Sequence, residues 1–215
     1  MKAKIVVLVS GNGTNLQALI DARQAGVFDA EFVLVVSSRA QAHALERARR
    51  AGIPTAVLPR KSYPDDKSYS EALLSLLEPY EPDLILLAGF MSVLSDAFVH
   101  RYRGRIMNTH PSLIPAFCGR GFYGDRVHRA ALDYGVKVSG ASIIFVEPGV
   151  DTGPIILQEA VPVLDDDDVE SLSQRVLAVE HRLYVRAVAL YLAGRLQLRG
   201  RRVIITPSEG GNKDD

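Results

Sequence analysis

KIVVLVSGNGTN, at residues 4–15, is the most informative segment of the chain for its fold class. The first half, Lys4–Val9, is a continuous run of β-branched and aliphatic residues, which is typical of a strand buried on both faces. The second half, Ser10–Asn15, is a glycine-rich turn that leads into a helical pattern over Asn15–Arg23. A buried strand, a tight turn and a helix in this order predict the opening of a parallel α/β sheet.

The same alternation continues through the rest of the chain. Strand patterns lie at 32–36, 55–58, 83–88, 105–109, 141–146 and 155–163, with a closing pair at 196–198 and 202–205. Helical patterns lie at 40–51, 68–77, 126–134 and 169–193, and residues 111–125 read as a loop. Alternation implies parallel strands in the first half, whereas the closely spaced later strands favour antiparallel pairing. We expect an α/β fold with a mostly parallel, mixed central sheet flanked by helices.

Length and composition restrict the class of protein. The chain has 215 residues, 47% of them hydrophobic, and we expect a single domain over residues 1–207 and a polar, disordered tail at 208–215. The 25 basic and 25 acidic residues balance, which disfavours nucleic-acid binding through bulk charge. A single cysteine, Cys118, excludes an intramolecular disulfide. No apolar run is long enough for a signal peptide or a membrane span, so we expect no membrane partner and a cytoplasmic location.

The turn Ser10–Asn15 has the composition of an anion-binding loop. Backbone N–H groups at a strand-to-helix turn can converge on an anion, and the helix dipole adds to the attraction. Leu16 stands where a dinucleotide motif has its third glycine, and no Lys follows as in a Walker A loop. A single phosphate therefore suits this short loop. The alternative is an ordinary turn in which Asn and Thr cap the helix.

An Asn-x-His pair ends the short strand at 105–109. Residues two apart on a strand share a face, so Asn108 and His110 are predicted to point into one pocket. An amide supplies a fixed donor for an oxyanion and an imidazole can transfer a proton, which are the two needs of a tetrahedral reaction. Asp151, in the Gly- and Pro-bounded loop at 148–154, is the candidate acidic partner of the imidazole. The alternative is that His110 ends a strand and Asp151 is a turn residue.

Six separated motifs, taken in order, resemble those of the phosphoribosylglycinamide formyltransferases, a family of folate-dependent enzymes of purine synthesis. The resemblance runs from Ile5 to about Leu196. HPSLIP is typical of formyltransferases in general, and SGNGTN with the chain length favours the glycinamide ribonucleotide branch. The motifs are VSGNGTNLQALI (9–20), LERARRAGIP (45–54), PDLILLAGFMSVLS (82–95), IMNTHPSLIPAF (106–117), GVDTGPIILQ (149–158) and VLAVEHRLYVRAV (176–188).

The resemblance implies a Rossmann-like formyltransferase fold, with phosphate binding in the N-terminal half and folate binding and catalysis in the C-terminal half. It implies formyl transfer from the co-substrate 10-formyltetrahydrofolate to the amine of glycinamide ribonucleotide, without a metal. The implied catalytic residues are Asn108, His110 and Asp151. The implied ribonucleotide-binding residues are Gly13, Thr14, Asn15 and Glu180, and the implied folate-binding residues are Met91, Ser92, Val93, Leu94 and Asn108.

Three places depart from the family pattern. Residues 118–130 (CGRGFYGDRVHRA) are a longer, Gly-rich version of a short family segment, so its contacts cannot be carried over. Ile144 stands where relatives commonly have a His. A folate-contacting Arg of the family falls at Asp66 or Lys67, and Lys67 would offer the folate tail only a point charge.

Several alternatives accompany this interpretation. A formyltetrahydrofolate deformylase would use the same three catalytic residues, whereas a non-catalytic nucleotide-binding module would not be expected to hold them together. Cys118 could be a nucleophile, but an ordinary loop thiol is favoured. Asp165–Asp168 resembles a metal-binding cluster, but residues that start a helix are favoured. The apolar stripe of the last helix favours core packing and leaves a homodimer open; it comprises Leu172, Val176, Val179, Leu183 and Ala187.

Overall fold

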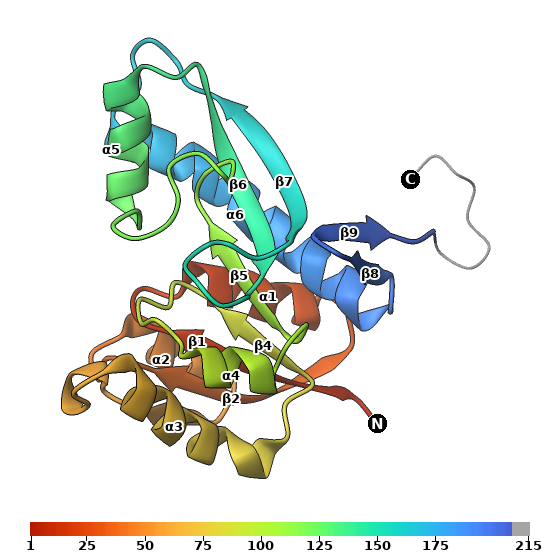
Figure 1. Ribbon diagram of the computed structural model, residues 1–215. Helices are drawn as coiled ribbons and strands as arrows, with labels where there is room; N and C mark the ends of the chain where they lie inside the picture. The colour runs from red at the N-terminus through yellow and green to blue at the C-terminus, as the bar shows by residue number, and fades with distance from the viewer. Residues whose placement is uncertain (208–215) are drawn as a thin grey trace.

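A computed structural model describes residues 1–207, so the predicted disorder of the tail at 208–215 lies outside the described residues. The centre is a seven-stranded sheet with the order β3-β2-β1-β4-β5-β6-β7 (Figure 1). Every strand that was expected in the sheet is present. These strands are β1 (Ala3–Val9), β2 (Ala30–Ser37), β3 (Thr55–Val57), β4 (Leu84–Leu87), β5 (Ile106–His110), β6 (Val138–Phe145) and β7 (Ile155–Pro162).

The sheet is mixed in the way that the spacing of the strands predicts. The five strands β1 to β5 pair in parallel, whereas β6 is antiparallel to both β5 and β7. The closing strand pair is a separate hairpin of β8 (Leu196–Arg199) and β9 (Arg202–Ile205), outside the main sheet. The prediction of a mostly parallel α/β fold is confirmed.

Helices cover both faces of the sheet and create two apolar cores (Figure 1). Side chains of β1 alternate between these cores, as expected for a strand covered on both faces. The larger core contains the expected stripe of the last helix, which confirms its core packing. That core includes side chains of α1 (Thr14–Gln24), α2 (His43–Arg50), α5 (Asp125–Tyr134) and α6 (Val169–Leu192), and the second those of α3 (Asp66–Leu77) and α4 (Asp96–Arg101).

Helix α4 is the one α-helix of residues 1–207 that the sequence pattern did not predict. It has six residues, too few to display a helical period. Its main local signal is Ser95, whose side chain accepts a hydrogen bond from the backbone N–H of Phe98 at 3.4 Å. Two short 3₁₀ turns, η1 (Arg60–Ser62) and η2 (Glu78–Tyr80), flank α3. Within residues 1–207, none of the helices is long and apolar enough to cross a membrane.

Candidate active site

The glycine-rich loop joins the carboxyl end of β1 to the first turn of α1. Gly13 is the residue before the helix and has a φ of 77°, and no side chain of residues 1–207 caps the helix there. A Cβ at Gly13 would lie 2.6 Å from the Cβ of Ala44, so glycine is required for both conformation and space. The first backbone hydrogen bond of the helix runs from Gln17 to Gly13, which leaves the preceding N–H groups without a helical partner. These donors can bind an anion.

Arg47 of α2 holds this loop in place. Its Nε donates to the carbonyl oxygen of Asn12 at 2.9 Å, and a terminal guanidinium nitrogen donates to the Asn12 side chain at 3.3 Å. The neighbouring backbone contact runs from the N–H of Ala44 to the carbonyl of Gly11 at 3.1 Å. The loop is therefore pre-formed by protein contacts.

His110 ends β5, and the loop after the antiparallel β6 places Asp151 beside it. Oδ2 of Asp151 lies 3.4 Å from Nδ1 of His110, and the two side chains are 8% and 5% exposed, respectively. The other ring nitrogen, Nε2, lies 2.9 Å from the carbonyl oxygen of Phe117. Asp151 also accepts a hydrogen bond from the backbone N–H of Gly119 at 3.0 Å. The sequence-based expectation that an acidic partner lies beside the imidazole agrees with this geometry.

The segment that carries Asp151, residues 146–154, is here called the Asp151 loop. Asp151 itself adopts a φ of 56°, which is uncommon for a residue other than glycine. At the base of the loop Gly153 packs so closely on the carbonyl of Phe145 that a Cβ there has no room. Within the loop the Thr152 hydroxyl donates to the carbonyl of Pro148 at 3.0 Å. The carboxylate is thus presented by a turn with little freedom at its base.

Asn108 lies two residues before His110 on β5 and is half-buried. Its register partners are Leu87 of β4 and Ile144 of β6. Within residues 1–207, its side-chain amide makes no hydrogen bond that meets normal distance and angle limits. Ile144 is a buried core residue next to Asn108, so the family histidine has no polar counterpart at this position.

A cavity of about 500 Å³ adjoins the His110–Asp151 pair. Its volume lies within the range of small-molecule sites, roughly 300–1,000 Å³. The segment after β4 that was expected to bind folate lines it, as do the Gly-rich 119–123 segment and the Asp151 loop. Asn108, the glycine-rich loop and Glu180 do not line the cavity. The lining residues include Met91, Ser92, Val93, Leu94, Thr109, His110, Gly119, Arg120, Gly121, Phe122, Tyr123, Gly149, Val150 and Asp151.

The cations of this cavity are not those that the sequence suggested. Lys67 is exposed and does not line the cavity, whereas Arg39 and Arg120 do. Asp66 lines the cavity, but its carboxylate accepts from the Arg60 guanidinium at 2.8 Å. Neither cavity arginine follows a recognisable sequence pattern, because each stands on a loop whose path only the tertiary structure defines.

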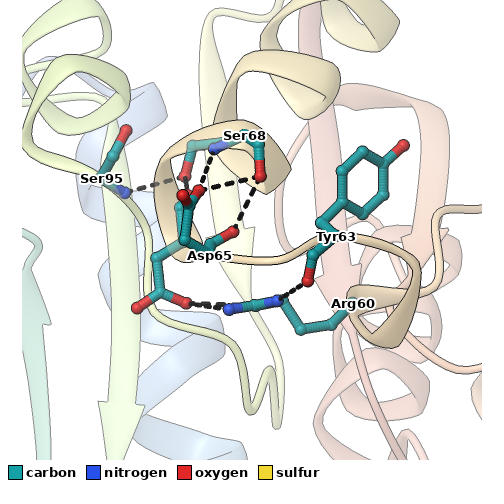
Figure 2. A network of polar contacts seen from close by, with 7 residues as sticks. Arg60, Tyr63, Asp65, Ser68 and Ser95 are labelled. Atoms are coloured by element: carbon teal, nitrogen blue, oxygen red, sulfur yellow. Dashed lines mark hydrogen bonds and ion pairs between the residues drawn. The ribbon is translucent and has the colours of Figure 1, made fainter.

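Figure 2 shows a polar network around the start of α3. Arg60 donates to Asp66 and also to the carbonyl of Tyr63, and Asp65 caps α3 by accepting from the Ser68 N–H at 2.7 Å. The backbone N–H of Ser95 donates to the Ser70 hydroxyl at 2.8 Å. Through this last bond, the segment after β4 is fastened to α3.

Glu180 of α6 is buried between β5 and α1. Its carboxylate accepts a hydrogen bond of 2.7 Å from the Thr109 hydroxyl. Burial raises the pKa of Glu180 to about 7, although hydrogen bonds from Thr109 and Asn15 oppose the rise. Glu180 therefore bonds to the strand that carries His110 and lies close to Asn15, at the end of the glycine-rich loop. Thr109 lies between Asn108 and His110 in the sequence, but its hydrogen bond to Glu180 could not be predicted from the sequence.

The surroundings of Cys118 and of the acidic run Asp165–Asp168 bear on the alternatives for both. Burial and the Asp151 charge both raise the pKa of the Cys118 thiol, which disfavours the thiolate that a nucleophile needs. Asp168 caps α6 in a capping box with Ser171, and Asp167 pairs with Arg175 at 2.6 Å. The helix-start interpretation of the acidic run is confirmed for these residues.

Parallel strands bring the glycine-rich loop and the Asn-x-His pair to one edge, and the loop after the antiparallel β6 places Asp151 beside His110. This arrangement defines a Rossmann-like α/β enzyme domain. A family model described as "Formyl transferase" matches residues 3–188. The chain belongs to the formyl transferase family, as its motifs predict.

Individual relatives agree with this assignment. The phosphoribosylglycinamide formyltransferase of Escherichia coli (strain K12) is 42% identical, over 90% of this chain and 89% of the relative. The crystal structure of glycinamide ribonucleotide transformylase 1 from Symbiobacterium toebii superimposes with a TM-score of 0.90 at 46% identity, covering 96% of this chain and 95% of that one.

Other relatives are longer or more distant. The trifunctional purine biosynthetic protein adenosine-3 of Gallus gallus is 45% identical over 92% of this chain, which spans only 19% of that relative's length. A formyltetrahydrofolate deformylase from Pseudomonas syringae has a TM-score of 0.87 at 22% identity, with 96% of this chain and 67% of that chain covered. This second likeness shows the shared fold alone.

Proposed function

We propose that the protein is a phosphoribosylglycinamide formyltransferase. It transfers the formyl group of 10-formyltetrahydrofolate to the amine of glycinamide ribonucleotide, and the products are formylglycinamide ribonucleotide and tetrahydrofolate. The observation that carries this proposal is the His110–Asp151 pair at 3.4 Å on the rim of a cavity lined by Met91, Ser92, Val93 and Leu94. The cytoplasmic location and the homodimer, which the sequence left open, stay predictions.

The ribonucleotide phosphate is assigned to the glycine-rich loop. The uncapped N–H groups at the start of α1 supply donors, the helix dipole adds attraction, and the Thr14 hydroxyl and Asn15 amide extend the donor set. Glu180, which already contacts Thr109 and Asn15, is assigned to the ribose or glycinamide part. Its carboxyl must exchange one of these partners, or share an oxygen, to meet a ribose hydroxyl.

The formyl donor is assigned to the cavity. Met91 and Val93 line the cavity and are 50% and 41% exposed, so they offer apolar surface to the flat aromatic rings of a folate. The folate tail carries carboxylates, and Arg39 and Arg120 line the same cavity. An Arg fork can bind a carboxylate in a bidentate manner, which Lys67 could not reproduce.

Catalysis is assigned to Asn108, His110 and Asp151. The acceptor amine attacks the formyl carbon, and the developing oxyanion is met by the Asn108 amide and the His110 imidazolium. The amine must lose a proton and the departing folate nitrogen must gain one, so the reaction is balanced without an external acid. Asp151 stabilises the imidazolium and can relay that proton, directly or through water.

Following a labelled formyl group tests the proposal. Purified protein is incubated with 10-formyltetrahydrofolate labelled in the formyl carbon, with and without glycinamide ribonucleotide. We expect label in formylglycinamide ribonucleotide and turnover that depends on the acceptor. Release of labelled formate at the same rate without acceptor would identify a deformylase instead, and no turnover in either mixture would favour a binding module.

A further inference from the structure

The turn of the β8–β9 hairpin contacts the Asp151 loop. A guanidinium nitrogen, Nη2, of Arg201 donates a hydrogen bond of 2.9 Å to the carbonyl oxygen of Thr152, the residue after Asp151. Figure 1 shows this hairpin beside the segment that joins β6 to β7. The contact therefore connects the end of the described chain to the loop that carries a predicted catalytic carboxylate.

The hairpin gives Arg201 a fixed base. Leu196 and Val203 pack against the larger apolar core, and β9 lies against β7 of the main sheet. Two hydrogen bonds close the open end of the hairpin. The backbone N–H of Thr206 donates to the carbonyl of Arg195 at 2.9 Å, and Nε of Arg195 donates to the carbonyl of Thr206 at 2.7 Å. Because the hairpin is fixed, an arginine on its turn can restrain the position of a carbonyl group to which it donates a hydrogen bond.

The Asp151 loop has few other constraints near its tip. Within residues 1–207, the Arg201 bond is the only one that joins its backbone between Glu147 and Gly153 to another part of the chain. The Gly119 N–H holds the carboxylate itself, and the Thr152 hydroxyl acts inside the loop. Without Arg201, the carbonyl of the peptide after Asp151 has no hydrogen-bond partner outside the loop among residues 1–207.

We propose that Arg201 is a positioning residue that keeps Asp151 against His110 by holding the Thr152 carbonyl. This inference rests on the proposed catalytic function of Asp151. A non-glycine residue keeps a φ of 56° only when its surroundings fix it, and relaxation toward a common conformation would redirect the carboxylate. Arg201 is exposed and does not line the cavity, so it acts through the loop and not on a substrate.

The expected effect is moderate, because a single exposed hydrogen bond is lost. We expect Arg201→Ala to lower kcat by roughly three- to tenfold, with KM for both substrates changed less than about twofold. Arg201→Lys retains one charged donor and should recover part of the loss. Arg199→Ala is the matched control, since Arg199 lies in the same hairpin and, among residues 1–207, its guanidinium forms a hydrogen bond only with Gln197.

Two further measurements separate positioning from general destabilisation. Hydrogen exchange of the amides at 149–153 should become faster in Arg201→Ala but not in Arg199→Ala. In an Asp151→Asn background, Arg201→Ala should have no further effect on kcat, because the carboxylate that it positions is absent. A variant that merely weakened the fold would lower kcat by the same factor in both backgrounds.

The outcomes distinguish this inference from the proposed function. Wild-type formyl transfer that is lost in Asp151→Asn but unchanged in Arg201→Ala would overturn the positioning proposal and leave the function intact. Equal losses in Arg199→Ala and Arg201→Ala, or additive losses with Asp151→Asn, would overturn it as well. An Asp151→Asn variant with wild-type kcat would instead contradict the catalytic assignment on which the inference rests.

Discussion

Nδ1 of His110 lies 3.4 Å from Oδ2 of Asp151, while Nε2 of the same ring lies 2.9 Å from the Phe117 carbonyl oxygen. The carbonyl oxygen accepts, and so does the carboxylate when it is ionised, so a proton on either ring nitrogen has an acceptor of the protein beside it. For a ring N–H to reach the reacting atoms, the substrate must replace one of these two acceptors.

Asn108→Ala should lower kcat by about 10²–10³-fold, because a preorganised oxyanion donor contributes roughly 2.7–4 kcal/mol in comparable sites. The side chain makes no normal hydrogen bond within residues 1–207, so its removal should leave stability nearly unchanged. Steady-state kinetics and thermal unfolding of the same preparation provide the check. A large drop in melting temperature with little change in kcat would argue for a structural function of Asn108.

Gly13→Ala should weaken binding of the ribonucleotide and leave binding of the formyl donor unchanged. The new Cβ would meet Ala44 at 2.6 Å, and the residue would have to keep a φ of 77°. Such strain costs about 1–3 kcal/mol. Gly26→Ala is the matched control, since Gly26 has a φ of 76° and open space around it. Equal KM values for the ribonucleotide in both variants would exclude a special function for Gly13.

Glu180→Gln should stabilise the protein at pH 8. Burial raises the pKa of Glu180 from its ordinary value of 4.5 to about 7, so the folded state binds this proton more tightly than the unfolded state. The stability that results is complete below about pH 4.5 and is lost as the pH rises through about 7. A neutral Gln avoids that loss and can still accept from Thr109.

Urea unfolding between pH 5 and 8 measures this effect. The gain of Glu180→Gln over wild type should reach about 3 kcal/mol at pH 8 and shrink to less than about 1 kcal/mol at pH 5. The same variant should bind the ribonucleotide less tightly, since the amide replaces a carboxylate acceptor. A difference in unfolding free energy that does not change with pH would contradict the assignment of a buried, titrating carboxyl.

Arg120→Ala should raise KM for the formyl donor by about fivefold, as expected for one partly exposed ion pair of about 1 kcal/mol. Lys67→Ala is the matched control, because Lys67 is exposed and does not line the cavity. The effect of Arg120→Ala should shrink in high salt, where exposed charges are screened. A greater KM change in Lys67→Ala would restore the interpretation that the sequence alone suggested.

The sequence could predict the parts of the site that lie at strand ends. The alternation of buried strands and helices implies a parallel sheet, and ligand sites in such sheets lie beyond the carboxyl ends of the strands. His110 and the turn at Ser10–Asn15 were located in this way. The pairing of His110 with Asp151 could be proposed because both residues follow strands that were expected in one sheet.

The remaining contacts depend on loop paths that have no periodic signature. Asp151 and Gly119 are bonded although 32 residues separate them, and Thr109 and Glu180 are bonded across 71 residues. Arg120 reaches the cavity because the 119–123 segment folds back over it, which its glycine-rich sequence permits but does not specify. Helix α4 was missed because six residues are too few to show a period.

The kcat of His110→Ala tests the central claim most directly. Formyl transfer to glycinamide ribonucleotide is measured for wild type and variant at saturating substrates, with binding of both ligands confirmed for the variant. Loss of the proton-transferring group should lower kcat by about 10²–10⁴-fold while both ligands still bind. A His110→Ala variant that binds both ligands and retains wild-type kcat would contradict the account.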